Sequence, residues 1–164
     1  MAVGGDGTVN DVLNGLTNFE QVTFAYIPSG SGNDLARGLH LETDPLKALE
    51  QILSGGQTGS IRIGELSTPA FSRRFLVSSG LGFDAAVCEG ALHSKFKKFL
   101  NQFHLGKLTY TGIALKEIFL SHCPKAKLIL DNDTVIETPT LLFASAMNLP
   151  YEGGGFQFCP EADS

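Results

Sequence analysis

Two glycine-rich turns constrain the fold of this chain more than any other feature of its sequence. The first is Gly4-Gly5-Asp6-Gly7-Thr8, and the second is Pro28-Ser29-Gly30-Ser31-Gly32-Asn33-Asp34. Each follows a short β-prone apolar segment, and each precedes apolar residues that recur at helical spacing. This repeated strand–turn–helix order predicts a parallel α/β sheet, in which both turns lie at the same edge.

The elements around the turns can be bounded from local signals. Apolar periodicity predicts a helix from about residue 7 to residue 17, and residues 23–27 are typical of a buried strand closed by Pro28. Either Asn33 or Asp34 is expected to cap the short helix that follows. A third helix is expected to begin at Asp44-Pro45 and to end at Gly55-Gly56.

The pattern changes after residue 59, where β-strands become frequent. Strands are expected over residues 60–66, 74–78 and 141–147, and a hairpin over 127–136 with its turn at 131–133. Helical stretches are expected over 84–104 and after Gly106. The predicted fold class is therefore α/β: a partial parallel α/β lobe over 1–57, then a partial β-rich, sandwich-like lobe with helical insertions over 58–164. The first lobe looks incomplete because Met1-Ala2-Val3 is short for a strand.

Composition excludes several classes of protein. Twelve basic and 17 acidic residues give a net charge of −5, so no nucleic-acid partner is expected. No apolar run approaches the roughly 18 residues of a membrane-spanning helix. Cys88, Cys123 and Cys159 are scattered, which is typical of reduced thiols, and a cytoplasmic location is expected.

The first glycine turn has the features of a phosphate site. Bare Cα positions let the backbone approach a phosphate, N–H groups at a helix start favour an anion, and Thr8 adds a hydroxyl. The carboxylate of Asp6 repels phosphate unless it faces Mg²⁺, a water or a ligand hydroxyl. The alternative is a plain turn that needs glycine for its backbone conformation, with Asp6 as helix cap. A Walker loop is excluded, because its motif is absent.

Taken together, the two turns resemble the catalytic domain of diacylglycerol kinases, which bacterial lipid kinases and sphingosine kinases share. The matching stretches are Gly4–Asn10 and Pro28–Arg37, and the resemblance continues through Gly80–Asp84, Gly106–Tyr110 and Gly153–Phe156. The first turn alone also occurs in NAD kinases. The second turn has the form found in lipid kinases.

The resemblance implies an ATP-dependent lipid kinase that uses Mg²⁺ and transfers the γ-phosphate of ATP to a lipid hydroxyl such as that of diacylglycerol. Residues 1–57 would then be the nucleotide-binding lobe and residues 58–164 the lipid-side lobe. Asp6 is expected to be catalytic and to hold the metal, and Asp84 to be catalytic on the acceptor side. The residues expected to bind ATP are Gly4, Gly5, Asp6, Gly7, Thr8, Val9, Asn10, Ser29, Gly30, Ser31, Gly32 and Asn33.

Partners and rival functions follow from the same residues. A lipid at a membrane surface and ATP are the expected partners, and a homodimer is left open. Lys95, Lys97 and Lys98 form either a transient membrane-docking face or a solvated helix face.

The rival functions are those of an NAD kinase-like small-molecule kinase and of a non-catalytic nucleotide-binding fragment. Because the family carries strands before the first turn and a general base expected beyond Ser164, the chain is expected to be a truncated form with little activity alone.

Overall fold

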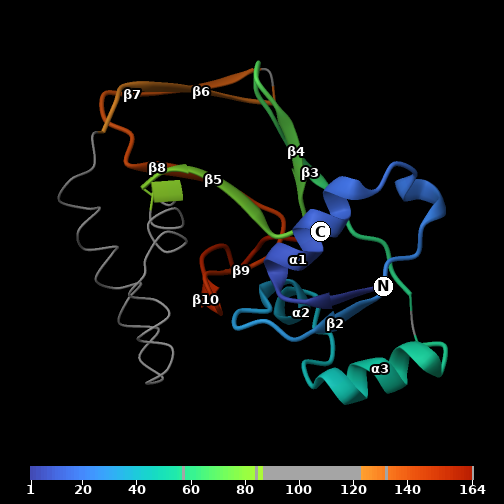
Figure 1. Ribbon diagram of the computed structural model, residues 1–164. Helices are drawn as coiled ribbons and strands as arrows, with labels where there is room; N and C mark the ends of the chain where they lie inside the picture. Colours follow the sequence, from blue (N-terminus) through green and yellow to red (C-terminus); the bar gives the residue numbers. More distant parts are fainter. Residues whose placement is uncertain (57, 84, 87–122, 132, 164) are drawn as a thin grey trace. The chain divides into compact units, whose positions relative to one another are not determined.

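The computed structural model describes residues 1–56, 58–83, 85–86, 123–131 and 133–163 (Figure 1). The chain forms two compact units, one of Met1–Ser79 with Ala146–Ser164 and one of Gly80–Ser145. This division differs from the expected one at residues 57 and 58. The two expected lobes, 1–57 and 58–164, and the functions assigned to them stay a prediction.

The first unit begins with a parallel strand pair, as the sequence predicts. Strand β1 (Ala2–Gly4) pairs with β2 (Tyr26–Pro28), with Ala2 opposite Tyr26 and Gly4 opposite Pro28. Helix α1 (Asp6–Gly15) connects them, followed by the short 3₁₀ helix η1 (Phe19–Gln21). Strand β2 is shorter than the expected strand 23–27 and ends one residue later, because β1 pairs with it only from Tyr26 to Pro28.

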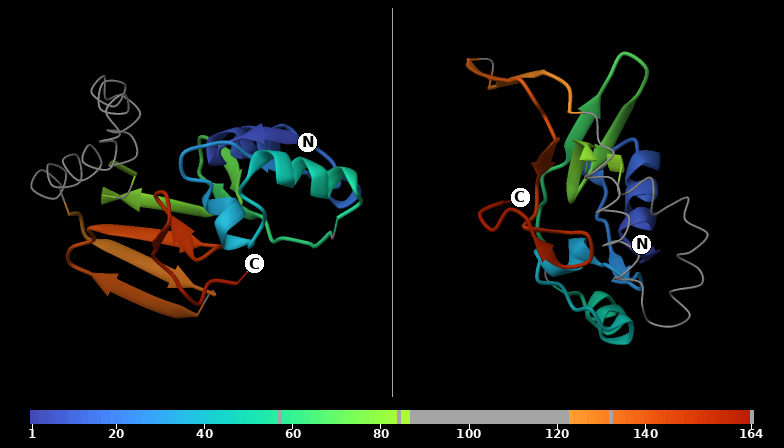
Figure 2. Two further views of the ribbon diagram at one scale, coloured as in Figure 1. Left: turned by 90° about the horizontal axis from the view of Figure 1, so that it is seen from below. Right: turned by 90° about the vertical axis from the view of Figure 1, so that its left-hand side faces the viewer.

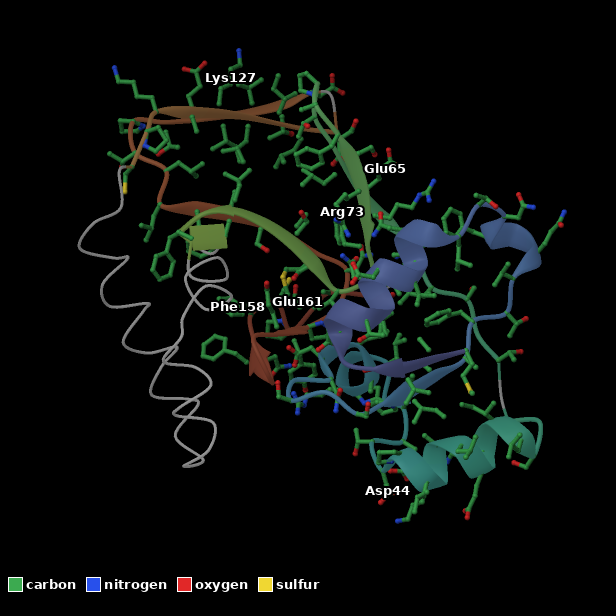
Figure 3. The ribbon with its side chains drawn as sticks, viewed as in Figure 1. Asp44, Glu65, Arg73, Lys127, Phe158 and Glu161 are labelled. Atoms are coloured by element: carbon green, nitrogen blue, oxygen red, sulfur yellow. The ribbon has the colours of Figure 1, made fainter. Side chains whose placement is uncertain are left out.

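Two further helices follow the strand pair. Helix α2 (Asp34–Gly38) comes directly after the second glycine turn, and α3 (Pro45–Leu53) lies farther along (Figure 1). The predicted start of α3 is confirmed, since Asp44 lies directly before its first turn (Figure 3). Its carboxylate accepts the N–H groups of Leu46 and Lys47. Its predicted end is confirmed too, because Gly55 has a positive φ of 75° directly after the last turn.

The core of the first unit draws on both ends of the described chain. It comprises Val9, Leu13, Tyr26, Leu35, Ala36, Leu76 and Leu149. Leu149 is 2% exposed and packs against Gly38 of α2. A Cβ placed on Gly38 would lie 3.0 Å from the Cβ of Leu149, so the two backbones approach closely here.

Two antiparallel hairpins complete the first unit. Strands β3 (Gly64–Ser67) and β4 (Ser72–Phe75) pair with each other, and β3 starts later than expected. Strand β4 is held to α1 because the Asn14 amide donates to the Arg74 carbonyl at 3.0 Å and accepts its N–H at 2.9 Å. The second hairpin consists of β9 (Tyr151–Glu152) and β10 (Phe156–Gln157).

The second unit contains the predicted long hairpin. Strands β6 (Ala126–Leu130) and β7 (Thr134–Thr138) pair antiparallel, drawn in orange in Figure 2. Strands β5 (Ser78–Gly82) and β8 (Phe143–Met147) form another pair, and the boundary between the units falls within both of them. The helices expected over 84–104 and after Gly106 fall outside the described residues apart from 85–86. Among the residues described, no helix is long and apolar enough to span a membrane.

Candidate functional site

The structure brings the two glycine turns together at the carboxyl ends of β1 and β2. The N–H of Ser29 donates to the carbonyl of Gly4 at 2.8 Å. Gly5 and Gly30 lie backbone to backbone, because a Cβ on Gly5 would lie 3.1 Å from the Cα of Gly30 and one on Gly30 would overlap Gly5. The glycines at these two positions are therefore required by the contact between the turns.

Asp6 joins the first turn to the helix that follows the second. Its Oδ1 accepts the N–H of Leu35 at 3.0 Å, and its Oδ2 accepts the N–H of Asp34 at 3.2 Å. Asn33 is the N-cap residue of α2, as one of the two expectations had it, but its side chain makes no capping bond, because the capping carboxylate comes from the other turn. Asp6 also does not cap its own helix, whose N-cap is Gly5.

The N-terminus of α1 is left without a side-chain cap. Within the described part of the chain, the N–H groups of Gly7 and Thr8 have no acceptor. The side chain of Thr8 folds back against Gly4, where a Cβ would have no room. A Cβ on Gly7, by contrast, would meet nothing within 4 Å. The helix start therefore presents unused donors beside a glycine that packing does not require.

The second turn has a fixed shape around Asn33. This residue adopts the left-handed conformation with φ 54°. Its Oδ1 accepts the Gly30 N–H at 2.9 Å, and its Nδ2 donates to the Gly30 carbonyl at 3.0 Å. The hydroxyl of Tyr26 donates to the same Oδ1 at 3.3 Å. Burial, and then the carboxylates of Asp6 and Asp34, raise the pKa of Tyr26 to about 12.

Asp34 ties a third segment to the two turns, and sequence reasoning did not include it in the site. The residue is 5% exposed. Its Oδ1 accepts from Arg37 Nη1 at 3.0 Å, and its Oδ2 accepts the N–H of Gly154 at 2.7 Å. Gly154 lies in the turn between β9 and β10, where Gly153–Gly155 all have positive φ values of 68°, 87° and 103°. The run of three glycines was the available signal, although a close crossing and a plain loop were equally compatible with it.

The carboxylates of Asp6 and Asp34 approach the same point. A Cβ on Gly32 would lie 3.1 Å from Asp6 Oδ2 and 3.6 Å from Asp34 Oδ2. Across the part of the chain that the structure covers, no three or more histidine, cysteine or acidic side chains cluster as metal ligands. Any metal held here would therefore need ligands from water or from a bound molecule in addition to these carboxylates.

The remaining expected site residues differ in how far their side chains are exposed. Ser29 and Ser31 are exposed on the second turn, and Asn10 is partly buried on α1. Val9 is 2% exposed in the core, so only its backbone can face a ligand. Asp84 lies outside the described residues.

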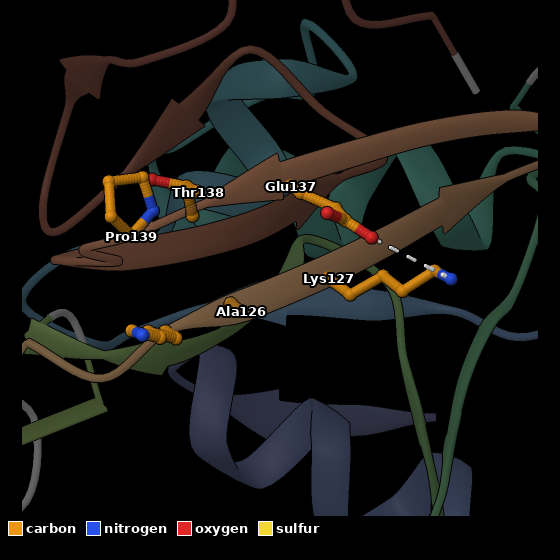
Figure 4. Close-up of a pocket in the computed structure, with 6 residues that line it drawn as sticks. Ala126, Lys127, Glu137, Thr138 and Pro139 are labelled. Atoms are coloured by element: carbon orange, nitrogen blue, oxygen red, sulfur yellow. Dashed lines mark ion pairs between the residues drawn. The ribbon is translucent and has the colours of Figure 1, made fainter.

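One pocket lies away from all the expected site residues. It lies on the β6–β7 hairpin and has a volume of about 490 Å³. Two of its lining residues, Lys127 and Glu137, form an ion pair with an N–O distance of 3.8 Å (Figure 4). Its lining residues are Lys125, Ala126, Lys127, Glu137, Thr138 and Pro139. It contains no residue of either glycine turn and is not part of the candidate site.

Comparison with known proteins identifies the family that the chain resembles. Residues 1–66 match the family model described as Diacylglycerol kinase catalytic domain. A diacylglycerol kinase of Mycobacterium tuberculosis (strain H37Rv) is 30% identical over 164 residues, which cover 99% of this chain and 50% of the relative. A diacylglycerol kinase of Staphylococcus carnosus is 33% identical over 104 residues, or 63% of this chain and 32% of the relative.

A solved structure supports the fold. The crystal structure of a diacylglycerol kinase from Bacillus anthracis matches 98% of this chain and 48% of that chain, with a TM-score of 0.58 and 24% identity. The mixed α/β fold class is thereby confirmed, and so is the resemblance to diacylglycerol kinases. The chain spans about half the length of the curated relatives that match nearly all of it.

Proposed function

We propose that this chain, as a relative of the diacylglycerol kinases, is the core of an ATP-dependent lipid kinase. The reaction would transfer the γ-phosphate of ATP to a lipid hydroxyl such as that of diacylglycerol. The observation that carries the proposal is the uncapped N-terminus of α1, which lies against the second glycine turn with the Gly7 and Thr8 N–H groups free within the described chain.

The triphosphate of ATP fits the electrostatics of this helix start. The N-terminus of a helix carries about half a positive charge, and its free N–H groups bind anions. Glycine in a helix costs about 0.5–1 kcal/mol relative to alanine. Because no neighbouring atom requires glycine at position 7, close approach of a phosphate is the reason we assign to it. Thr8 and Ser31 would add hydroxyl donors.

Mg²⁺ fits the two carboxylates. Each oxygen of Asp6 accepts one backbone N–H, so each keeps a further lone pair for a metal or its water. In proteins, Mg²⁺ takes one or two carboxylates together with waters and substrate phosphates, and a dedicated protein cage is not needed. Asp6 would hold the ion, with Asp34 beside it. The ion would neutralise phosphate charge when bound.

The chain's own contribution to phosphoryl transfer is positioning, which accounts for most of the catalysis in this reaction class. Asp6 links the N-terminus of α1 to that of α2, and Asp34 links α2 to the β9–β10 turn. These bonds would fix the donor phosphates relative to one another. Asp84 is proposed to act on the acceptor side, and the lipid would be reached at a membrane surface.

Two measurements test the proposal. Isothermal titration with Mg-ATP is expected to show saturable binding, and the folded protein is expected to melt at higher temperature with Mg-ATP present. In keeping with the little activity expected of the chain alone, incubation with γ-labelled ATP and vesicles containing diacylglycerol is expected to label the lipid only slightly. Label transferred to NAD instead would support the NAD kinase-like alternative. Absence of Mg-ATP binding would overturn the nucleotide site itself.

A further inference from the structure

The hydroxyl of Tyr26 has a place in the site that strand packing does not explain. Tyr26 is 7% exposed on β2, with its ring in the core of the first unit. A purely apolar residue would fill that position as well, because the ring contributes the buried area. The hydroxyl instead reaches Asn33 in the second glycine turn, with an oxygen–oxygen distance of 3.3 Å.

Asn33 transmits this contact to Gly30. Its left-handed conformation is costly for a residue with a side chain, and three hydrogen bonds at the carboxamide offset that cost. Two of them hold the N–H and the carbonyl of Gly30. Gly30 is therefore fixed on both sides of its Cα, and that Cα lies against Gly5, the N-cap of α1.

The backbone of Gly30 fixes the orientation of the carboxamide, and the Tyr26 hydroxyl therefore donates to Oδ1. Oδ1 of Asn33 receives two donors, the Tyr26 hydroxyl and the Gly30 N–H, whereas Nδ2 faces the Gly30 carbonyl. A turned carboxamide would place Nδ2 against the Gly30 N–H, donor facing donor, and Oδ1 against the Gly30 carbonyl, acceptor facing acceptor. The phenol keeps its proton into the alkaline range, because burial and the nearby carboxylates raise its pKa.

We infer that Tyr26 is a positioning residue for nucleotide binding: acting through Asn33, its hydroxyl holds Gly30 against Gly5 and so sets the distance between the second turn and the phosphate-binding start of α1. This inference rests on the proposed function, since it assumes that phosphate binds where the two turns meet.

The test is the variant Tyr26→Phe, which removes one oxygen and keeps the ring. A lost hydrogen bond of ordinary strength predicts that the Kd for Mg-ATP rises about fivefold. The Kd for adenosine, which has no phosphates, is expected to stay unchanged. Tyr151→Phe is the matched control, because it makes the same chemical change in the same unit and no hydrogen bond of its hydroxyl is found in the described chain.

A double-mutant cycle then asks whether Tyr26 acts through Asn33. Asn33→Gly removes the carboxamide but tolerates the left-handed backbone. In that background, Tyr26→Phe is expected to change the Kd for Mg-ATP by less than twofold. In the ligand-free protein, the NMR signals of the Gly30 amide and the Asn33 side chain are expected to shift in Tyr26→Phe and not in Tyr151→Phe.

The outcomes separate the two proposals. If the unmodified protein does not bind Mg-ATP, the proposed function fails, and the positioning role fails with it. If the unmodified protein binds and Tyr26→Phe binds equally well, the positioning role alone is overturned. A fivefold loss that persists in the Asn33→Gly background overturns the route through Asn33.

Discussion

At the scale of single residues, the site depends on the carboxylate of Asp6, which has both a proposed binding role and a capping role. Asp6 stands beside the helix start proposed to bind phosphate, and it also receives the first two N–H groups of α2. The resemblance predicted Asp6 as a site residue. Its link to Asp34 and Leu35 could not be predicted, because a bond between positions so far apart in sequence depends on the pairing of β1 with β2.

Substitution of Asp6 separates its structural role from metal binding. Asp6→Ala removes both caps of α2 and is expected to lower the free energy of unfolding by about 2 kcal/mol in urea titrations. Asp6→Asn keeps one acceptor oxygen and is expected to lose about half as much. Both variants are expected to lose most of the affinity for Mg-ATP. If Asp6→Asn binds Mg-ATP like the unmodified protein, Asp6 does not hold the metal.

Gly7 gives a test in which stability and binding change in opposite directions. Gly7→Ala is expected to raise the free energy of unfolding by about 0.5–1 kcal/mol, because its Cβ enters open space in a helix. It is also expected to weaken Mg-ATP binding at least tenfold, because the same Cβ occupies the approach of the phosphate. Gly15→Ala is the control, since it lies at the other end of α1 with equally open surroundings. It should raise stability alone, and equal binding by both variants would contradict the phosphate assignment.

The pKa of Tyr26 makes stability depend on alkaline pH. The pKa is about 12 in the folded protein, against 10.0 for an unperturbed tyrosine. Between these values the unfolded chain releases the proton and the folded chain keeps it, so the free energy of unfolding falls as pH rises. Urea midpoints measured between about pH 9 and 11 are expected to fall less steeply for Tyr26→Phe. Identical slopes would show that the phenol is not held as described.

At the scale of elements, local chemistry predicted helix ends better than strand ends. The boundaries of α3 follow from Asp44, Pro45 and the glycine pair after it, because capping is decided within one turn. Strands β2 and β3 are shorter than predicted, since a strand extends only as far as its partner does. The β6–β7 hairpin was predicted because its turn residues and its strands are adjacent in sequence.

The Asp44 cap can be tested apart from the site. Asp44→Ala leaves the N–H groups of Leu46 and Lys47 without their acceptor and is expected to cost about 1 kcal/mol of unfolding free energy. Asp44→Ser, another good cap, is expected to retain most of the stability. Affinity for Mg-ATP should be the same in both variants. A large loss of affinity in either would mean that α3 contributes to the nucleotide site.

At the scale of the whole molecule, the first unit is discontinuous in sequence. Its core includes Leu149, which packs on Gly38, and its site includes the turn held by Asp34. Sequence patterns identified both glycine turns, but they did not show that residues from the other end of the chain complete the unit. Residues distant in sequence join a core through tertiary packing, which local periodicity does not report.

Loss of Leu149 should therefore destabilise a unit that is mostly made of much earlier residues. Leu149→Ala is expected to lower the free energy of unfolding by about 3 kcal/mol, since it leaves a cavity beside Gly38. Leu142→Ala, at a position 39% exposed, is expected to cost much less. Circular dichroism in urea measures both. Equal losses would contradict the packing of Leu149 on α2.

The segment that contains Leu149 and Gly154 also determines when the first unit can be completed during synthesis. Gly154, which binds Asp34, is made more than a hundred residues after the glycine turns. At ordinary translation rates this interval lasts on the order of ten seconds. Throughout it, the nascent turns lack both the Leu149 side chain and the Gly154 amide. A chaperone that shields short apolar strands would have its longest opportunity to act on β1, β2 and α2.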